Sequence, residues 1–208
     1  MRVLFLCPRI PWPLNDGGNL AMMAMAELWK NAGHEVSLFC LNTLKHHVDP
    51  PSLPARLTER INVYSSSIDT SIRPWDAFRN LFARGESYNV ARFHSLEAEV
   101  HLKKILQEHA FDVVVFESLF TTPYLSTVRH YTDASLILRS HNVEHMIWNR
   151  LASQCNSWLK KSYLFFLSRR IQSYEKGILP LFDGILPISS TDEMVYRQWT
   201  PEIGRAHV

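Results

Sequence analysis

The sequence predicts an α/β fold built on a doubly wound, mostly parallel sheet. Short apolar runs such as RVLFLC (2–7) and FDVVVFES (111–118) are typical of strands that are covered on both faces. Amphipathic helical segments lie between these runs, so that strands and helices alternate along the chain. The 208 residues are 46% hydrophobic, which is enough to fill the core of one globular domain.

The first elements form a βαβ unit, which requires a parallel crossover. In order they are strand 2–7, a Pro- and Gly-rich loop 8–18, helix 19–33 and strand 34–41. Asn19 can cap the helix, and Gly33 suits the left-handed residue that ends it. Leu20, Ala24 and Leu28 stand at helical spacing and are expected to share a face of this helix.

The rest of the chain continues the alternation. Strands are expected at 61–66, 111–118, 134–140 and 182–189, and helices at 74–84, 95–109, 119–130, 143–153, 157–179 and 190–199. The polar segment 42–57 is expected to be mostly loop, and Ser190 with Glu193 matches a capping box.

Composition excludes several functional classes. A net charge of +2 gives no general attraction to nucleic acid, and no signal peptide is visible. Cys7, Cys40 and Cys155 form no CxxC pair, which favours reduced thiols in a cytoplasmic protein.

Residues 141–145 match H-x-x-E-H, a spacing that some zinc peptidases place on a helix. The match requires His141 and His145 on one face of a formed helix. The preceding SLILRS (135–140) is typical of a strand, so His141 is expected in a loop and the next helix near Val143. We therefore expect no metal site, and zinc analysis of the purified protein would test that alternative.

Polar residues follow four of the predicted strands. These residues are Asp16, Gly17 and Gly18 after the first, Glu117 and Ser118 after the fourth, His141 and Asn142 after the fifth, and Ser189 after the last. Ligands of open α/β sheets bind beyond the carboxyl ends of the strands, so these clusters predict a shared cleft. Ordinary helix capping is the alternative.

The turn NDGG (15–18) has the composition of a phosphate-binding turn. Two glycines let a ligand approach the backbone, and the helix N-terminus favours an anion. The turn matches neither G-x-G-x-x-G nor a P-loop, so we expect no dinucleotide cofactor or ATP, and a plain glycine turn stays open.

Taken together, the motifs resemble the N-terminal domain of family 4 glycosyltransferases, over positions 1–200. The matching segments, in the family's order, are RVLFLCPRIPWPLNDGG, GHEVSLF, FDVVVFES, LRSHNVEHMIWNRLA, YEKGILPLFDGILPIS and STDE. The resemblance implies the N-terminal half of a GT-B fold, which consists of two facing Rossmann-like domains.

The resemblance also implies a function: retaining transfer of a sugar from a nucleotide-sugar donor to a cell-envelope glycan or lipid-linked acceptor. No cofactor or metal is implied. Gly17 and Gly18, with Asp16 beside them, would approach the donor phosphates and sugar, and His141 would hydrogen-bond the sugar. Asn142 and Glu144 belong to an HNVE variant of the family motif and, with Glu117, Ser118 and Ser189, are expected around the cleft.

Two segments qualify this reading. EIGRAHV (202–208) back-translates to the start of a common sequencing adapter, so we expect the domain to span 1–201 and the donor-binding half to be missing, leaving the chain alone inactive. The aromatic and basic segment 148–170 could contact an anionic membrane at its inner face or be a helix with a solvated basic face. A non-catalytic Rossmann-like domain that binds a phosphate ligand is the rival function.

Overall fold

The computed structural model describes residues 1–73, 75 and 87–200, together with the backbone of 204–205. The helix expected at 74–84 lies almost wholly outside these residues. All strand pairs in the described chain are parallel, and the sheet order is β3-β2-β1-β4-β5-β6-β7. The strands are β1 (Arg2–Cys7), β2 (Glu35–Thr43), β3 (Asn62–Ile68), β4 (Val113–Glu117), β5 (Ser135–Ser140), β6 (Gly184–Pro187) and β7 (Gly204–Arg205). The predicted α/β, doubly wound parallel sheet is confirmed.

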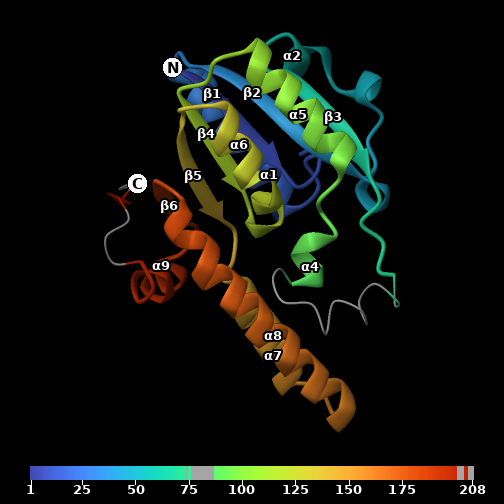
Figure 1. The fold of residues 1–208 in the computed structure, drawn as a ribbon. Coiled ribbons are helices and arrows are strands. Elements are labelled where there is room, and N and C mark those ends of the chain that lie inside the picture. The colour runs from blue at the N-terminus through green and yellow to red at the C-terminus, as the bar shows by residue number, and fades with distance from the viewer. Residues whose placement is uncertain (74, 76–86, 201–203, 206–208) are drawn as a thin grey trace.

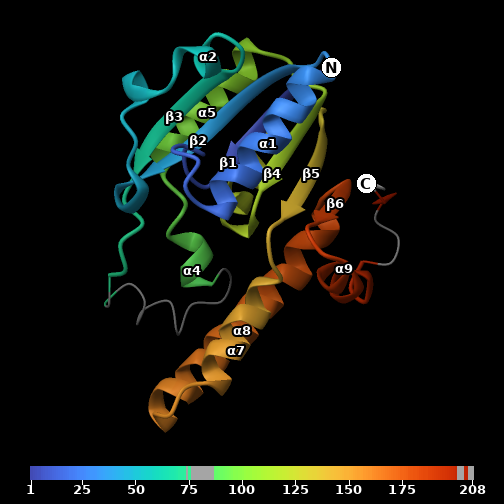
Figure 2. The same ribbon diagram turned by 180° about the vertical axis from the view of Figure 1, so that it is seen from behind.

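Helices cover both faces of the sheet. The helices are α1 (Gly17–Asn31), α2 (Ala55–Thr58), α4 (Tyr88–Ala91), α5 (Leu96–Glu108), α6 (Leu125–Tyr131), α7 (Glu144–Ser153), α8 (Trp158–Ile178) and α9 (Ser190–Arg197). Figure 1 shows α5 and α6 in front of the sheet, and Figure 2 shows α1 on the opposite face. The pair α7 and α8 projects away from the sheet in both views.

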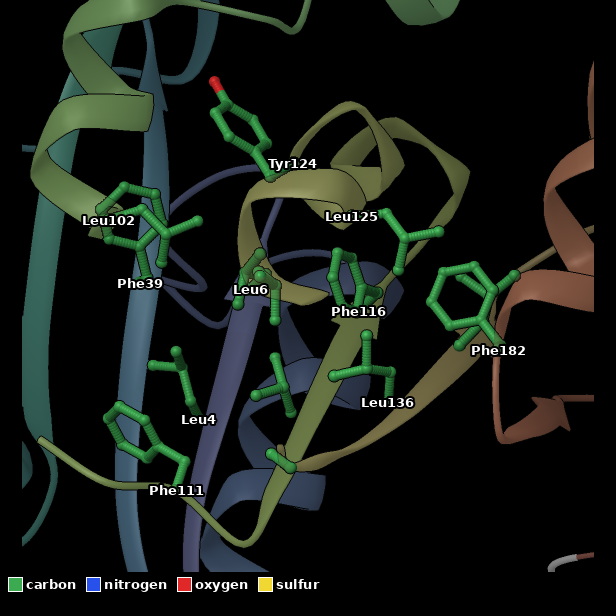
Figure 3. Close-up of a cluster of buried hydrophobic side chains, with 14 of the residues drawn as sticks. Leu4, Leu6, Phe39, Leu102, Phe111, Phe116, Tyr124, Leu125, Leu136 and Phe182 are labelled. Carbon is green, nitrogen blue, oxygen red and sulfur yellow. The ribbon is translucent and has the colours of Figure 1, made fainter. Parts of the chain in front are cut away.

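The core divides by strand alternation, because successive side chains of a strand point to opposite faces. Leu4 and Leu6 pack with Phe116 under α5 and α6, as Figure 3 shows. Val3 and Phe5 point the other way and pack under α1. Continuous apolar strands therefore bury both faces, as the composition of RVLFLC indicates.

Helix α1 differs from the prediction in its start. Asp16, rather than Asn19, is the N-cap, and its carboxylate accepts a hydrogen bond from the Asn19 amide. The buried face consists of Asn19, Met22, Met23 and Ala26, whereas Leu20 is 49% and Leu28 is 64% exposed. The helix is apolar around most of its circumference, so periodicity alone could not select the correct face. Gly33 has φ +87° and ends the helix as predicted.

Other differences are local. The helix expected at 119–130 begins as a 3₁₀ segment, Leu119–Tyr124, that contains Pro123, and α6 follows it. Segment 42–57 holds two 3₁₀ turns, Leu44–His46 and Pro50–Ser52, and the start of α2. Ser189, rather than Ser190, caps α9 by accepting from the Asp192 amide. All three cysteines are free thiols.

Candidate functional site

A cavity of about 660 Å³ lies along the carboxyl edge of the sheet. Its walls come from the segments that follow β1 to β5. Five of the predicted site residues line it, namely Gly18, Ser118, His141, Asn142 and Glu144. The order β2-β1-β4-β5 reverses direction between β1 and β4, so the cavity lies at the topological switch point where such sheets bind ligands.

His141 stands just past β5 and contacts a buried ion pair. Glu117, at the end of β4, is fully buried, and its Oε2 accepts a hydrogen bond from Arg139 Nη1 at 2.8 Å. The His141 Nε2 atom lies 2.6 Å from the same oxygen. Glu117 and Arg139 are register partners of adjacent strands, so the sheet itself brings the two charges together.

This arrangement sets the tautomer of His141. Glu117 Oε2 accepts from Arg139, and a carboxylate only accepts hydrogen bonds. A neutral His141 imidazole that donates to this oxygen through Nε2–H keeps Nδ1 as an acceptor. The imidazole lines the cavity, so the pair presents an oriented hydrogen-bond acceptor to a ligand hydroxyl. The helix α7 starts at Glu144 with Val143 as its N-cap, which confirms that His141 lies in the loop between strand and helix.

Ser118 follows Glu117 with a strained backbone. Its φ of 85° lies in a region that residues with a side chain rarely adopt. The Ser118 hydroxyl accepts a hydrogen bond from the Phe120 amide at 3.2 Å, which helps to hold the conformation. Such strain is concentrated at functional sites because the surroundings must hold it in place.

The glycine turn differs from the predicted phosphate cradle. The Asp16 carboxylate lies over the N-terminus of α1, where hydrogen bonds from the amides of Asn19 and Gly18 hold its pKa below the usual range. Arg9 pairs with the same carboxylate at 2.7 Å. A Cβ at Gly18 would lie 2.9 Å from Arg9 Nη2, so the glycine makes room for this cation, while Gly17 has open space around it. The anion position at this helix is thus filled by the protein's own carboxylate.

Glu144 lines the cavity in an apolar setting. Burial, with the neighbouring Glu175 carboxylate adding repulsion, raises the pKa of Glu144 to about 7. Glu175 of α8 accepts from the Glu144 amide at 2.8 Å and contacts His145 Nδ1 at 2.6 Å. Glu144 is consequently a carboxyl group that exchanges its proton near neutral pH.

The two histidines of the H-x-x-E-H match face different partners. His141 contacts Glu117 and His145 contacts Glu175, so they do not converge on one point. Among the residues that the structure describes, no group of three or more His, Cys, Asp or Glu side chains could hold a metal ion. Ser189 lies outside the cavity and caps α9, and Asp16 borders a smaller neighbouring hollow.

Sequence reasoning missed three residues that shape the site, Arg9, Arg139 and Glu175. Arg139 carried a usable signal, because it is the only charged residue in SLILRS, and Glu117 is the only charged residue in VVVFE. A lone charge in a buried strand needs a partner. Glu175 lies far along the chain in a helix and carried no comparable signal.

Comparison with known proteins supports a GT-B half-domain. The chain is similar to UGT71G1 of Medicago truncatula, solved with UDP-glucose, with a TM-score of 0.53 and 12% identity over 96% of this chain and 49% of that one. It is also similar to UGT2 of Phytolacca americana, solved with UDP-2-fluoro-glucose and pterostilbene, with a TM-score of 0.47 and 14% identity over 99% of this chain and 51% of the other. The first of these neighbours has a GT-B fold.

One curated relative comes from a bacterium. An "uncharacterized 44.6 kDa protein in cps region" of Klebsiella pneumoniae is 29% identical over 197 residues, which cover 92% of this chain and 46% of the relative. The chain thus spans about half the length of the proteins it matches. No protein-family profile matches it. The fold and the switch-point cavity define the chain as one Rossmann-like half of a GT-B architecture.

Proposed function

We propose that the chain is the acceptor-side half of a retaining glycosyltransferase of the family 4 type. It would transfer a sugar from a nucleotide-sugar donor to a cell-envelope glycan or lipid-linked acceptor, with no cofactor or essential metal. The observation that carries the proposal is the switch-point cavity with His141 oriented by Glu117. The solved neighbour with UDP-glucose supports the donor class, and the cps-region relative supports an envelope glycan as product.

The chemistry follows from charge. The bond between the sugar C1 and the phosphate oxygen breaks, and a new bond forms from C1 to an acceptor hydroxyl oxygen. Retention requires both events on one face of the sugar, so the departing phosphate oxygen can accept the hydroxyl proton. His141 Nδ1 would accept a hydrogen bond from a donor-sugar hydroxyl and hold C1 in position. Arg9, whose Nη2 lies beside Gly18, would face the departing negative charge.

The filled helix N-terminus weakens the rival function. A domain that bound a phosphate ligand through the amides at the start of α1 would need them free, and the Asp16 carboxylate already accepts a hydrogen bond from the Asn19 amide. Anion binding at that turn would first have to displace Asp16 from Arg9.

The test is transfer by the natural full-length gene product, identified by reading the coding sequence beyond codon 201. Panels of UDP- and GDP-sugars are incubated with candidate acceptors in buffer and in EDTA, and NMR reads the anomeric configuration of the product. We expect transfer with retention, undiminished by EDTA. Transfer from no donor on the panel would refute the function, and an inverted product would refute the retaining mechanism.

His141→Ala is the matched site variant. It is expected to lose transfer while keeping its far-ultraviolet circular dichroism, because the side chain touches the cavity and not the core. His130→Ala, an exposed histidine on α6, is the control and should keep full activity. Normal turnover by His141→Ala would remove this residue from the site.

We further propose that the hairpin of α7 and α8 contacts an anionic membrane surface. Trp148 and Phe165 pack inside the hairpin, but Trp158 is 73% and Phe166 is 40% exposed. Lys160 and Lys161 lie close to Trp158 in the first turn of α8, and Arg169 and Arg170 follow Phe166. Exposed aromatics beside cations suit the headgroup region of anionic lipid. In the described part of the chain, no helix is both long and apolar enough to cross a bilayer.

Co-sedimentation with vesicles tests the contact. Binding is expected to vesicles that contain phosphatidylglycerol and not to pure phosphatidylcholine, and Trp158→Ala should weaken it severalfold. Leu96→Ala removes a similarly exposed apolar side chain on α5 and should leave binding unchanged. Equal binding to both lipids, or by both variants, would contradict the proposal.

A further inference from the structure

The cavity extends from His141, which follows β5, to a basic side that includes Lys45 and Arg92, two residues without a role in the proposed transfer. Arg92 lines this side and follows α4. Its guanidinium lies 5.4 Å from the centre of the Phe93 ring and donates to the Thr70 carbonyl at 3.1 Å and the Asn89 carbonyl at 3.4 Å. Arg92 forms no ion pair with any carboxylate of the described residues.

An arginine in this setting favours an anion. Burial lowers its pKa from the ordinary value, which shows that the cation has lost water without gaining a carboxylate. A guanidinium has five N–H donors, and the described hydrogen bonds account for only part of them. The nearby Asp69 carboxylate is engaged by the Arg73 side chain and the Ser71 amide.

Lys45 adds a second cation on the same side. Thr43 pairs with Ile68 at the ends of β2 and β3, so the segments that carry Lys45 and Thr70 leave the sheet side by side. Both residues line the cavity, and Arg92 is bonded to Thr70. Lys45 and Thr70 follow β2 and β3, whereas His141 follows β5, so the cavity extends across the carboxyl ends of these strands.

Two aromatic rings line the cavity beside Arg92. Phe93 and Phe120 stack with their centres 4.8 Å apart and an interplanar angle of 23°, and both border the cavity. An aromatic face binds the C–H face of a sugar ring, while the polar edge of that ring stays available for hydrogen bonds. The occupant suggested by this surface is a saccharide.

We propose that Arg92 and Lys45 form a subsite for an anionic group on the acceptor saccharide, one ring of which lies on Phe120. This inference rests on the proposed function, because that function makes the bound saccharide the acceptor. The subsite would select acidic acceptors, such as a glycan with a uronic acid or a glycosyl phosphate, over neutral ones.

Binding to the full 208-residue chain tests the subsite with three small probes, namely methyl glucoside, methyl glucuronide and glucose 1-phosphate, by NMR titration. We expect the anionic probes to bind about tenfold tighter than the neutral one, in line with a charge-assisted hydrogen bond. Which anionic probe binds more tightly identifies the acidic group as carboxylate or phosphate.

Variants separate charge from shape. The double variant Arg92→Gln/Lys45→Gln should abolish the preference for anions and leave methyl glucoside unaffected, and Arg92→Gln alone should reduce the preference. Arg92→Lys should keep much of the preference, and Phe120→Ala should weaken all three probes alike. Arg56→Gln removes an exposed cation on α2 and should change nothing. Equal affinities in the wild type, or an anion preference that survives in the double variant, would overturn the inference. Both of these results can occur while the gene product still transfers sugar, so they would refute the subsite and not the transfer. A preference for anionic probes in a gene product that transfers no sugar would count against the proposed function alone.

Discussion

Replacing Glu144 with glutamine tests the link between the cavity and the stability of the fold. The ordinary pKa of a glutamate is 4.5, and burial with repulsion from Glu175 raises that of Glu144 to about 7. The unfolded chain therefore ionises this group at lower pH than the folded chain does. Between pH 4.5 and 7 the unfolded state holds fewer protons, so the free energy of unfolding falls as pH rises through this window.

The magnitude follows from the size of the pKa change. A rise in the pKa of Glu144 from 4.5 to about 7 lowers the free energy of unfolding by about 3 kcal/mol at high pH. This loss of stability is absent below pH 4.5 and complete above pH 7. Glu144→Gln stays neutral at every pH and keeps the backbone amide that donates to Glu175. We expect the variant to be about 2 to 3 kcal/mol more stable than the wild type at pH 8. At pH 5 we expect it to be more stable by less than about 1 kcal/mol.

Urea denaturation at pH 5 and pH 8 measures this difference through the transition midpoint. Glu59→Gln, an exposed glutamate at the end of α2, is the control and should change stability equally at both pH values. The reasoning fails if Glu144→Gln shows the same stability difference from the wild type at pH 5 and at pH 8, because the group would then ionise alike in both states.

Three further predictions concern the strand ends. Glu117→Gln leaves the buried Arg139 cation without its carboxylate and is expected to lower the free energy of unfolding by about 3 kcal/mol in urea; an unchanged midpoint would show that the ion pair is dispensable. Ser118→Gly relieves the strain of the positive φ and should be at least as stable as the wild type. Ser118→Ala keeps the strain and loses the hydrogen bond from the Phe120 amide, so its free energy of unfolding should fall by about 1 kcal/mol. The order of the two urea midpoints tests this. Asp16→Ala removes the N-cap of α1 and should lower the free energy of unfolding by about 1 kcal/mol. The same change frees the helix amides and Arg9, so inorganic pyrophosphate should bind more tightly than to the wild type in a titration. Weaker binding would show that the anion binds elsewhere.

The parts of the fold that could be predicted are those set by local pattern. RVLFLC and VVVFE bury both faces of their strands, so a continuous apolar run was a sufficient signal for β1 and β4. Gly33 was assigned correctly because a left-handed residue after a helix is a local requirement. The place of His141 in the loop after β5 followed from the strand pattern of SLILRS.

What could not be predicted depends on register and on the direction of side chains. Glu117 meets Arg139 only because β4 and β5 are neighbours in a particular register, and no local pattern specifies that pairing. The role of Asp16 depended on whether α1 begins two residues earlier than expected, which decides whether the glycine amides are free. The spacing of Leu20 and Leu28 did not say which face of α1 is buried, because the methionines of the same helix offer an equally apolar one.

Hydrogen bonds join the α7–α8 hairpin to the side of the cavity that carries His141. Glu175 of α8 binds the backbone and the imidazole at the start of α7, and Ser168 of α8 donates to the His145 carbonyl at 2.8 Å. On the other side, the Tyr196 hydroxyl of α9 contacts Ser140 Oγ at 2.6 Å. The loop that carries His141 is therefore held at both of its ends, by α8 through the start of α7 and by α9 through Ser140. Because α8 runs unbroken from the exposed Trp158 to Glu175, one helix joins the tip of the hairpin to the residue that binds the start of α7.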